Sequence, residues 1–351
     1  MYTNHITLNG KQISSAEIFC QTAELTRNPA ISDWERELYL FLNECFSDSD
    51  FVLAQTSGST GEPKQIKLPK SVMKKSAERT IEYFGLKKND RLLLSLPCRY
   101  IAGKMMVVRA IIGQMNLITV DPAGDFEILA TEKIDFGAMV PNQVFNILDQ
   151  LSGKEKLQNV RNLLIGGSAI STGLESKIST LLSRVVSTYG MTETASHIAI
   201  RELSGEQKSD YYHCLPEISV SLNELDCLQI HLPELAEPLQ TNDLAELQSD
   251  KSFRILGRAD SVIISGGIKH SPEAIEKKLE NIIRQRFIIS GLPDEKLGKK
   301  LVLIIEGKPF DTNILEQKIA ADLQPFEQPK IIIFLNKFQE TTSGKIIREA
   351  P

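Results

Sequence analysis

The sequence lacks any pair of closely spaced cysteines. Its five cysteines are scattered and odd in number, and its five histidines form no helical His-x-x-x-His pair. A disulfide scaffold and a structural zinc site both need such spacings, so neither is expected to organise this fold. We expect the cysteines to be free thiols in a reducing cytoplasm; they are Cys20, Cys45, Cys98, Cys214 and Cys227.

The sequence also lacks a strong excess of charge and any long apolar run. The 40 basic and 45 acidic side chains give a net charge of −5, which argues against nucleic acid or a membrane surface as the main partner. No apolar run approaches the ~20 residues of a membrane-spanning helix, and the first residues, "MYTNHITLNGKQ", lack the layout of a secretion signal. We expect a cytoplasmic protein, not inserted in a membrane, that acts on small molecules; a homo-oligomer stays possible.

What the chain does contain is an alternation of short apolar runs and longer helical patterns. Runs such as "FVLAQT", "DRLLLSLP", "NLLIGG" and "RVVSTYG" are bounded by Gly, Pro or polar residues. They alternate with helical segments such as "KSVMKKSAERTIEYFG" and "GKMMVVRAIIGQ". This alternation predicts an α/β fold with a mainly parallel sheet covered by helices.

The pattern of apolar and polar residues changes after about residue 205. The 351 residues are also more than a single hydrophobic core usually contains, which favours two domains. Shorter strands follow, then a compact tail with a helix "SPEAIEKKLENIIRQR", a strand "KLVLIIEG", a helix near 312–323 and a strand "KIIIFL". We predict a large domain over residues 1–257 and a small α+β domain over residues 258–351, with the boundary near "GRADS".

One loop concentrates hydroxyls, glycines and a lysine. "TSGSTGEPK" places Thr56, Ser57, Gly58, Ser59, Thr60 and Gly61 in a row before Lys64. Glycines let the backbone approach a phosphate closely, while amides, hydroxyls and a lysine supply donors and counter-charge. The loop is not a Walker A motif, because Pro63 precedes the lysine, and a solvated turn is the alternative reading.

A second polar stretch, "STYGMTETASH", follows an apolar run. The strand is expected to end at Tyr189, Gly190 permits a sharp turn, and residues 192–194 are expected to open a helix. Ordinary helix capping explains the threonines and Glu193 in one reading. In the other, Tyr189 faces an adenine, Thr192 a phosphate oxygen and Glu193 a magnesium ion.

These segments carry a family resemblance. "TSGSTGEPK", "YGMTETAS", "TNDLAEL", "GRADSVIISGGIKHSPEAIE" and "TTSGKIIREA" occur in the order typical of the acyl-adenylate-forming superfamily, which includes acyl-CoA ligases, luciferases and peptide-synthetase adenylation domains. Within it, "SLPCRYIAGKMMVVRA" and "TETASHIAIR" are most similar to the 2-succinylbenzoate–CoA ligases of menaquinone biosynthesis. The resemblance implies an AMP-forming ligase that uses ATP, Mg²⁺ and coenzyme A.

The resemblance also implies roles for residues. The loop of residues 56–64 closes over ATP, Glu193 holds Mg²⁺ and Lys345 is the catalytic lysine, with Thr192 beside the phosphates. Asp260 is a hinge about which the small domain moves as a lid, so that the "SGGIKH" face replaces Lys345 for thioester formation. The expected nucleotide-binding residues are completed by Gly166, Gly167 and Ser168 along the adenine, Tyr189 with Gly190 and Met191, and Asp243 with Arg258 at the ribose; Gly266 and Gly267 face coenzyme A.

Some positions depart from the family pattern. Asn242 replaces a glycine, which predicts either a left-handed asparagine or a reshaped turn. Tyr100 stands where a histidine is usual, and the phosphate loop comes early in the chain, which implies a shortened N-terminal subdomain. Candidates for the acid pocket are Arg99, Tyr100, Lys104, Ser196 and His197, of which we favour Tyr100, Ser196 and His197 as substrate-binding residues.

Two other functions stay open at the level of sequence. The chain could activate another aromatic or short acid, or load a carrier protein as a free-standing adenylating enzyme. It could also be a nucleotide-binding protein that has lost turnover.

Overall fold

A computed structural model describes residues 4–25, 27–55, 65–339, 346 and 348. The chain divides into two compact units. Unit 1 comprises Met1–Ile170, Lys177–Ile218 and Leu232–Glu234, and unit 2 comprises Ser171–Ser176, Ser219–His231 and Leu235–Pro351. The boundary expected near residue 257 stays a prediction.

Unit 1 is built on a mixed sheet whose central strands are parallel. In the spatial order β1-β6-β5-β7-β8-β9 each strand runs parallel to its neighbour, while β2 pairs antiparallel with β1, β10 with β9 and β11 with β10. The central strands are apolar and buried, as expected for a sheet covered on both faces. The bounds are β1 His5–Leu8, β2 Lys11–Ser14, β5 Arg91–Leu94, β6 Asn116–Thr119, β7 Ile134–Met139, β8 Val160–Ile165, β9 Arg184–Gly190, β10 His197–Glu202 and β11 Tyr212–Cys214.

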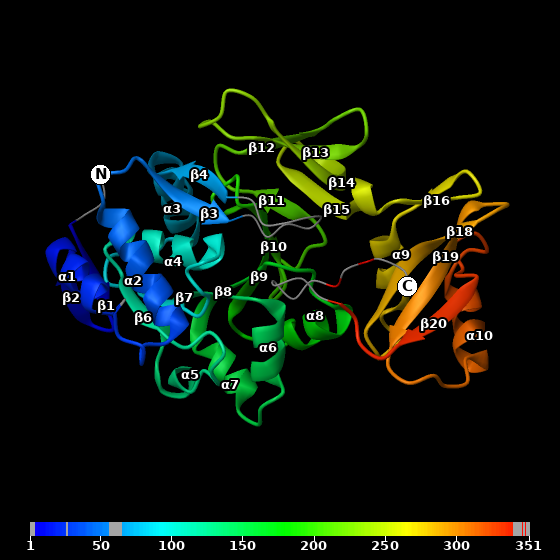
Figure 1. The fold of residues 1–351 in the computed structure, drawn as a ribbon, viewed down its shortest axis with the longest axis horizontal. Helices are drawn as coiled ribbons and strands as arrows, with labels where there is room; N and C mark the ends of the chain where they lie inside the picture. The colour runs from blue at the N-terminus through cyan, green and yellow to red at the C-terminus, as the bar shows by residue number, and fades with distance from the viewer. Residues whose placement is uncertain (1–3, 26, 56–64, 340–345, 347, 349–351) are drawn as a thin grey trace. The chain divides into compact units, whose positions relative to one another are not determined.

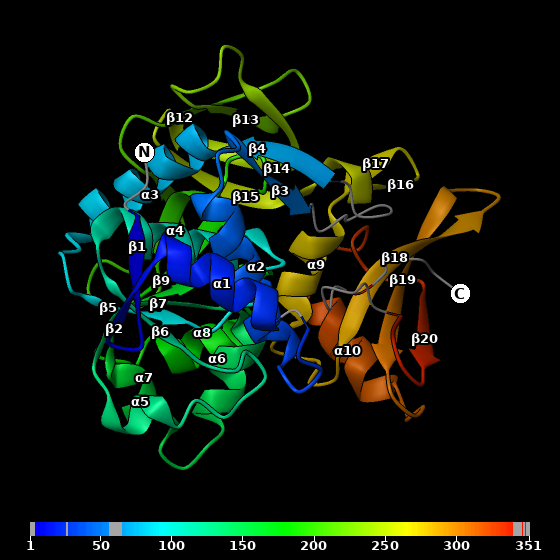
Figure 2. The same ribbon diagram turned by 60° about the vertical axis from the view of Figure 1, so that its left-hand side comes forward.

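Helices lie on both sides of this sheet, with α3 and α4 on one side and α6 and α7 on the other (Figures 1 and 2). Helix α4 is buried almost all round, because each of residues 103–111 is buried. The α/β fold class predicted from the sequence is confirmed. The helices of unit 1 are α1 Ser15–Leu25, α2 Asp33–Phe46, α3 Lys70–Phe84, α4 Ile101–Gly113, α5 Ile128–Thr131, α6 Pro141–Leu148 and α7 Gly153–Gln158, while α8, Thr172–Ile178, is divided between the two units.

The run at residues 51–56 does not join the parallel sheet, contrary to expectation. It forms β3 (Phe51–Gln55), which pairs antiparallel with β4 (Gln65–Pro69) in a separate two-stranded sheet. Burial alternates along β3, so that Val52 and Ala54 are buried while Leu53 is exposed. That period of two marks a strand covered on one face, whereas the parallel strands are buried on both.

Unit 2 contains an antiparallel meander and a second sheet. The meander runs β12-β13-β14-β15, with bounds Ser219–Leu222, Cys227–His231, Leu239–Ser249 and Ser252–Arg258. A short 3₁₀ turn, Ala259–Ser261, leads to the second sheet. Its elements are β16 Ile263–Ser265, β17 Ile268–His270, α9 Pro272–Leu279, β18 Phe287–Asp294, β19 Gly298–Glu306, α10 Asn313–Asp322 and β20 Ile331–Leu335.

The second sheet has a separate core on each face. Leu301, Leu303 and Ile305 of β19 pack with α9 and α10, whereas Val302 and Ile304 face the opposite side. The helix expected to run through residue 286 is wrong in extent: α9 ends at Leu279, and residues 287–294 form strand β18. Ile283 lies beyond the helix yet packs into the same core, so tertiary burial overrides helix propensity here.

The described helices include none that is both long and apolar enough to cross a membrane. The five cysteines, all within the described ranges, are free thiols.

Candidate functional site

The polar segments of unit 1 begin where two parallel strands end. Strands β8 and β9 pair in register from Asn162–Arg184 to Ile165–Ser187, so their carboxyl ends lie at the same edge of the sheet. Gly166, Gly167 and Ser168 directly follow β8, and Tyr189 and Gly190 end β9. Ligands gather at this edge of open parallel sheets. The structure thus brings the expected adenine-binding residues of unit 1 to one place.

Different constraints explain the two glycines after β8. A Cβ on Gly166 would lie 2.4 Å from Oγ1 of Thr188, the hydroxyl that donates to the Ile165 carbonyl at 3.3 Å. Gly167 has a φ of +91°, a conformation that residues with a side chain rarely adopt. Packing against Thr188 therefore requires glycine at position 166, and the backbone conformation favours it at position 167.

Residues 191–196 form a compact turn that leads straight into β10, so the helix expected to open at Thr192 is wrong. The Thr194 hydroxyl bonds the Met191 amide at 3.1 Å and the Ser196 carbonyl at 2.6 Å, and Ala195 has a φ of +62°. A threonine side chain that satisfies the local backbone in this way competes with helix formation.

The remaining candidate residues in and before this turn differ in their exposure to solvent. Thr192 is 9% exposed, while Tyr189 and Glu193 are half-buried. The Tyr189 ring lies 5.9 Å from that of Tyr212 at a tilt of 57°. Within the described residues no hydrogen bond or ion pair involves the Glu193 carboxylate, so its oxygens remain available to a hard cation.

A buried arginine joins Ser196 and His197, and the sequence analysis missed it. Arg109 of α4 is 2% exposed, and its Nη2 lies 2.5 Å from Oγ of Ser196 and 3.5 Å from Nδ1 of His197. On the other side of the ring, His197 Nε2 lies 3.4 Å from Oγ1 of Thr80. The signal in the sequence was a single arginine inside the apolar helix pattern "MMVVRAII".

Burial sets the charge states in this cluster. Desolvation lowers the pKa of Arg109 to about 9, which leaves it a cation at neutral pH. Desolvation first, and the Arg109 charge second, lower the pKa of His197 well below 6.5, so the imidazole is neutral. Because an arginine only donates, His197 Nδ1 is the unprotonated nitrogen and Nε2 carries the proton.

Arg109 has no counter-ion among the described residues. Its guanidinium contacts the neutral Ser196, His197 and Met106 and lies over the ring of Phe136, and its buried Nε has no hydrogen-bond partner among the described residues. A desolvated charge without a partner is costly, which distinguishes this position from an ordinary packed arginine.

The other cations proposed for the acid pocket already have carboxylate partners on α2. Arg99 Nη1 lies 2.9 Å from Glu37, and Lys104 Nζ lies 3.3 Å from Glu44. Tyr100 precedes α4 and is half-buried, nine residues before Arg109, or about 13 Å along a helix. The structure therefore groups Ser196 and His197 with Arg109 and leaves Tyr100 apart.

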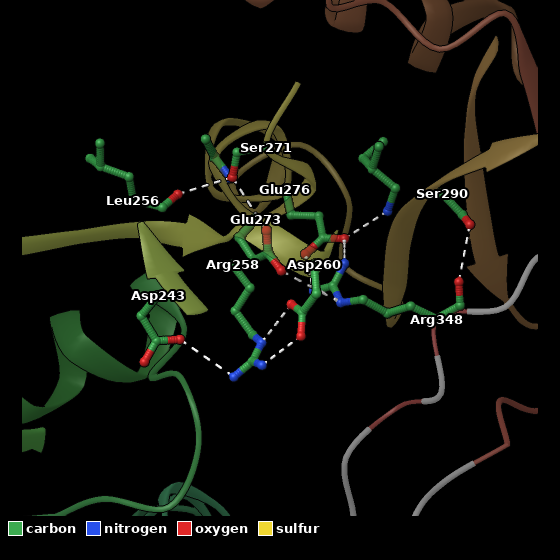
Figure 3. Close-up of polar contacts among 11 residues, drawn as sticks. Asp243, Leu256, Arg258, Asp260, Ser271, Glu273, Glu276, Ser290 and Arg348 are labelled. Carbon is green, nitrogen blue, oxygen red and sulfur yellow. Dashed lines mark hydrogen bonds and ion pairs between the residues drawn. The ribbon is translucent and has the colours of Figure 1, made fainter. Parts of the chain in front are cut away.

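In unit 2 the structure brings Asp243, Arg258 and Asp260 together (Figure 3). Arg258 donates to both oxygens of Asp260 at 2.8 and 2.6 Å, and to Asp243 at 3.4 Å. The hydrogen bonds between Arg258 and Asp260 raise the pKa of the arginine and lower that of the aspartate. Asn242 lies within β14 and has no left-handed backbone, so that alternative is wrong, and the reshaped turn stays a prediction.

The two glycines expected at the coenzyme A face form a hairpin turn. Gly266 and Gly267 connect β16 to β17 and have φ values of +58° and +82°. A two-residue hairpin with positive φ at both positions favours glycine.

Two expected parts of the site lie outside the described residues. These are the loop with Thr56, Ser57, Gly58, Ser59, Thr60, Gly61 and Lys64, and the lysine Lys345.

Comparisons with known proteins identify similar sequences and structures. A sequence profile described as AMP-binding enzyme matches residues 22–222. A protein of Lactococcus lactis subsp. lactis (strain IL1403), named 2-succinylbenzoate–CoA ligase, is 25% identical over 320 residues, which cover 85% of this chain and 70% of that protein.

Solved structures show the same fold. A protein from Dyadobacter fermentans DSM 18053, described as an acyl-CoA synthetase (AMP-forming)/AMP-acid ligase II-like protein, matches with a TM-score of 0.62 and 33% identity, over 92% of this chain and 94% of that one. O-succinylbenzoate coenzyme A synthetase from Bacillus subtilis, solved with ATP and magnesium ion, matches with a TM-score of 0.77 over 98% and 96% of the two chains. Its 17% identity makes that likeness one of fold alone.

Proposed function

Because this chain belongs to the AMP-binding enzyme family, we propose that it is an ATP-dependent ligase that joins a carboxylic acid to coenzyme A. The family resemblance read from the motifs is confirmed by the profile match and by the Dyadobacter relative. We further propose 2-succinylbenzoate as the acid and menaquinone biosynthesis as the pathway. The name of the Lactococcus relative supports this choice.

The reaction we propose has two steps. In the first, the acid carboxylate attacks the α-phosphorus of ATP, pyrophosphate leaves and an acyl adenylate forms. In the second, the thiolate of coenzyme A attacks the acyl carbon and AMP leaves. The first step makes a good leaving group of an oxygen that would otherwise depart as oxide.

The obstacle in the first step is electrostatic, because an anion approaches a polyanion. We propose that the donors of residues 56–64 and the Lys345 ammonium neutralise the charge that develops on the phosphates. Glu193 fits a magnesium ion bound with the triphosphate, which would supply further positive charge. Alignment of carboxylate and phosphorus contributes as well, by up to about 7–11 kcal/mol at best.

We propose the following nucleotide contacts. Gly166, Gly167 and Ser168 line the adenine, and Tyr189 stacks on it. Asp243 and Arg258 bind the ribose hydroxyls. When the ribose binds, Arg258 would give up part of its hydrogen bonding to Asp260 and donate to the sugar hydroxyls instead.

The observation that carries the choice of a dicarboxylic acid is the uncompensated Arg109 cation. One carboxylate of 2-succinylbenzoate reacts and the other keeps its charge, so the second needs a cationic partner. Arg109 is a buried cation that lacks a carboxylate within the described residues, and half-buried Ser196 is the most accessible member of its cluster. We propose that the unreacted carboxylate is bound through Ser196 and Arg109, with His197 holding both in place.

A panel of acids tests this function on the full chain. We expect acid-dependent pyrophosphate release to be fastest with 2-succinylbenzoate, slower with benzoate and fatty acids, and coupled to thioester formation when coenzyme A is present. ATP binding without AMP formation from any acid would contradict the proposal and favour a nucleotide-binding protein. Adenylate formation that coenzyme A never discharges would favour an enzyme that loads a carrier.

The same panel tests the acid site through Arg109→Gln. We expect KM for 2-succinylbenzoate to rise roughly 10- to 100-fold, as for a lost charge-assisted hydrogen bond, while KM for ATP stays close to its original value. Preference for the dicarboxylic acid over benzoate should shrink in parallel. Arg161→Gln, which removes an exposed arginine paired with Asp90 and Asp135, is the control and should leave the preference intact.

A further inference from the structure

Thr80 of helix α3 contacts the ring of His197. The residue is fully buried, at 0% exposed, and its Oγ1 lies 3.4 Å from Nε2 of that ring. The same Oγ1 donates to the backbone carbonyl of Ser76, four residues earlier in the helix, at 3.1 Å. One hydroxyl therefore connects the backbone of α3 to the ring nitrogen opposite the one that contacts Arg109.

The carbonyl fixes the direction of each hydrogen bond in this chain. A carbonyl oxygen only accepts, so the single hydroxyl proton of Thr80 is committed to Ser76. Thr80 then offers the imidazole only a lone pair, and Nε2 of His197 carries the proton that makes this contact a hydrogen bond. Nδ1 is left as an acceptor. The donors of Arg109 require the same state from the other side of the ring, so two neighbours select one tautomer.

The tautomer of His197 decides what the Ser196 hydroxyl can do. Nη2 of Arg109 donates to Ser196 Oγ at 2.5 Å, so the serine oxygen already accepts there. Its own proton can be donated to Nδ1 of His197, 3.2 Å away, or to a bound anion. If an anion takes that proton, Nη2 of Arg109 can still donate to Nδ1, at 3.5 Å. The cluster can thus offer a hydroxyl proton to an anion without leaving a buried ring nitrogen unsatisfied.

We propose that Thr80 is a positioning residue for the acid site: by accepting the Nε2 proton, it holds His197 in the tautomer that frees the Ser196 hydroxyl to bind the unreacted carboxylate. This inference rests on the proposed function, in which Ser196 and Arg109 bind that carboxylate. Thr80 itself is fully buried and acts only through the ring.

The reason lies in what removal of the Thr80 oxygen would leave behind. The Nε2 proton of His197 would lose its acceptor, and a buried donor without an acceptor is costly. Moving the proton to Nδ1 would set a donor against the donors of Arg109. Either response displaces the ring or the arginine, and Ser196 with them.

The tautomer can be read from the wild-type protein. In a chain that contains ¹⁵N-labelled histidine, NMR distinguishes a ring nitrogen that carries a proton from one that does not. We expect His197 to show a protonated Nε2 and a bare Nδ1 at neutral pH, with its signals assigned as those missing from His197→Gln. A protonated Nδ1 in the wild type would overturn the inference without any change at position 80.

The variant Thr80→Val replaces the hydroxyl with a methyl group and so removes the acceptor. We expect KM for 2-succinylbenzoate in ATP–pyrophosphate exchange to rise roughly 5- to 50-fold, as for a buried group left without its hydrogen bond, with kcat and KM for ATP close to their original values. The Nε2-protonated form should no longer be the single tautomer. Thr80→Ser keeps the hydroxyl and should retain both the tautomer and the KM.

Thr22 of α1 provides the matched control. It is 4% exposed, and its hydroxyl donates to the carbonyl of Ile18, four residues earlier, at 2.7 Å. Thr22→Val therefore removes a comparable buried hydroxyl from a helix that carries none of the acid-site residues. The His197 tautomer and KM for the acid should both survive that change. Thermal denaturation of all variants shows whether unit 1 remains folded.

The outcomes separate the inference from the function on which it rests. A Thr80→Val protein in which the tautomer and KM for the acid do not change together, or in which neither changes, overturns the positioning role. An equal rise of KM in Thr80→Ser or Thr22→Val overturns it too, because the oxygen acceptor would not be the cause. A wild-type protein without acid-dependent exchange removes the proposed function and the acid-binding part of the inference, while the NMR spectrum still decides the tautomer.

Discussion

At the scale of single residues, His197 shows how burial and a neighbouring cation fix a protonation state. The ring is 8% exposed and lies between Arg109 and Thr80. Its pKa is lowered well below the 6.5 of an unfolded chain. Folding therefore excludes a proton that the unfolded chain binds in mildly acidic solution.

This exclusion predicts a pH dependence of stability. The contribution of His197 is fully present above pH 6.5 and is lost as the pH falls from 6.5 toward the lowered native pKa, with a slope of up to about 1.4 kcal/mol per pH unit. Urea denaturation between pH 7.5 and 5 measures it. In His197→Gln the free energy of unfolding should decline less steeply over that range than in the wild type.

Exposed His213 of β11 supplies the control for this experiment. His213→Gln should keep the wild-type slope. Parallel curves for the wild type and His197→Gln would show that the buried ring does not exclude the proton.

At the level of residues, a motif in the sequence is what marked the candidates. Ser196 and His197 were named because they follow "TETA", and the structure joins them by a contact of 3.2 Å between Oγ and Nδ1. Arg109 was missed, because a helical pattern shows that a position is internal but not what faces it from an element 80 or more residues away in sequence. Only the three-dimensional structure shows that Arg99 and Lys104 have carboxylate partners and that Arg109 has none among the described residues.

At the scale of elements, local sequence patterns located most strands and helices but did not show which segment each of them pairs with or packs against. The parallel strands from β5 to β9 were anticipated from buried apolar runs, which carry their signal in composition. The separate hairpin of β3 and β4, strand β18 and the turn before β10 were not. Each depends on a pairing or a packing contact between segments that composition alone does not connect.

The junction between β9 and β10 gives a prediction at this scale. A Cβ on Gly190 would lie 2.4 Å from the Ser196 carbonyl oxygen and 2.6 Å from the His197 Cα, and these are backbone atoms that cannot rotate away. We expect Gly190→Ala to reduce the free energy of unfolding by about 1–3 kcal/mol, as for overpacking, and to raise KM for the acid because Ser196 and His197 shift. Chemical denaturation and steady-state kinetics measure the two effects.

Gly173 provides the matched substitution. It lies exposed in α8 with nothing within 4 Å of an added Cβ. Gly173→Ala should leave stability unchanged or raise it by up to about 1 kcal/mol. If both alanine variants behave alike, close backbone approach is not the reason for glycine at position 190.

At the scale of the whole molecule, we propose that the two half-reactions use different groups beside the same reacting carbonyl. Lys345 serves adenylation in our proposal, whereas the face that contains Gly266 and Gly267 serves thioester formation. Both belong to the chain that follows Asp260. A rotation about Asp260 would exchange one for the other, and such closing and opening steps are common in catalysis.

Asp260 lies in the 3₁₀ turn between β15 and β16, where its carboxylate accepts two hydrogen bonds from Arg258. Asp260→Pro fixes the backbone at this position, restricts Ala259 before it, and also removes the ion pair. Asp260→Ala removes the ion pair but leaves the backbone free. The difference between the two variants therefore isolates the backbone rotation.

We expect Asp260→Pro to retain ATP–pyrophosphate exchange and to lose most of its thioester formation, whereas Asp260→Ala retains both. The physical reason is that a chain locked in the adenylating arrangement still presents Lys345 but not the glycine hairpin. Rapid mixing of each variant's pre-formed acyl adenylate with coenzyme A measures the second step directly. Equal loss of both steps in Asp260→Pro, or a matching loss in Asp260→Ala, would place the cause in stability or in Arg258 rather than in rotation, because neither pattern depends on which arrangement the backbone allows.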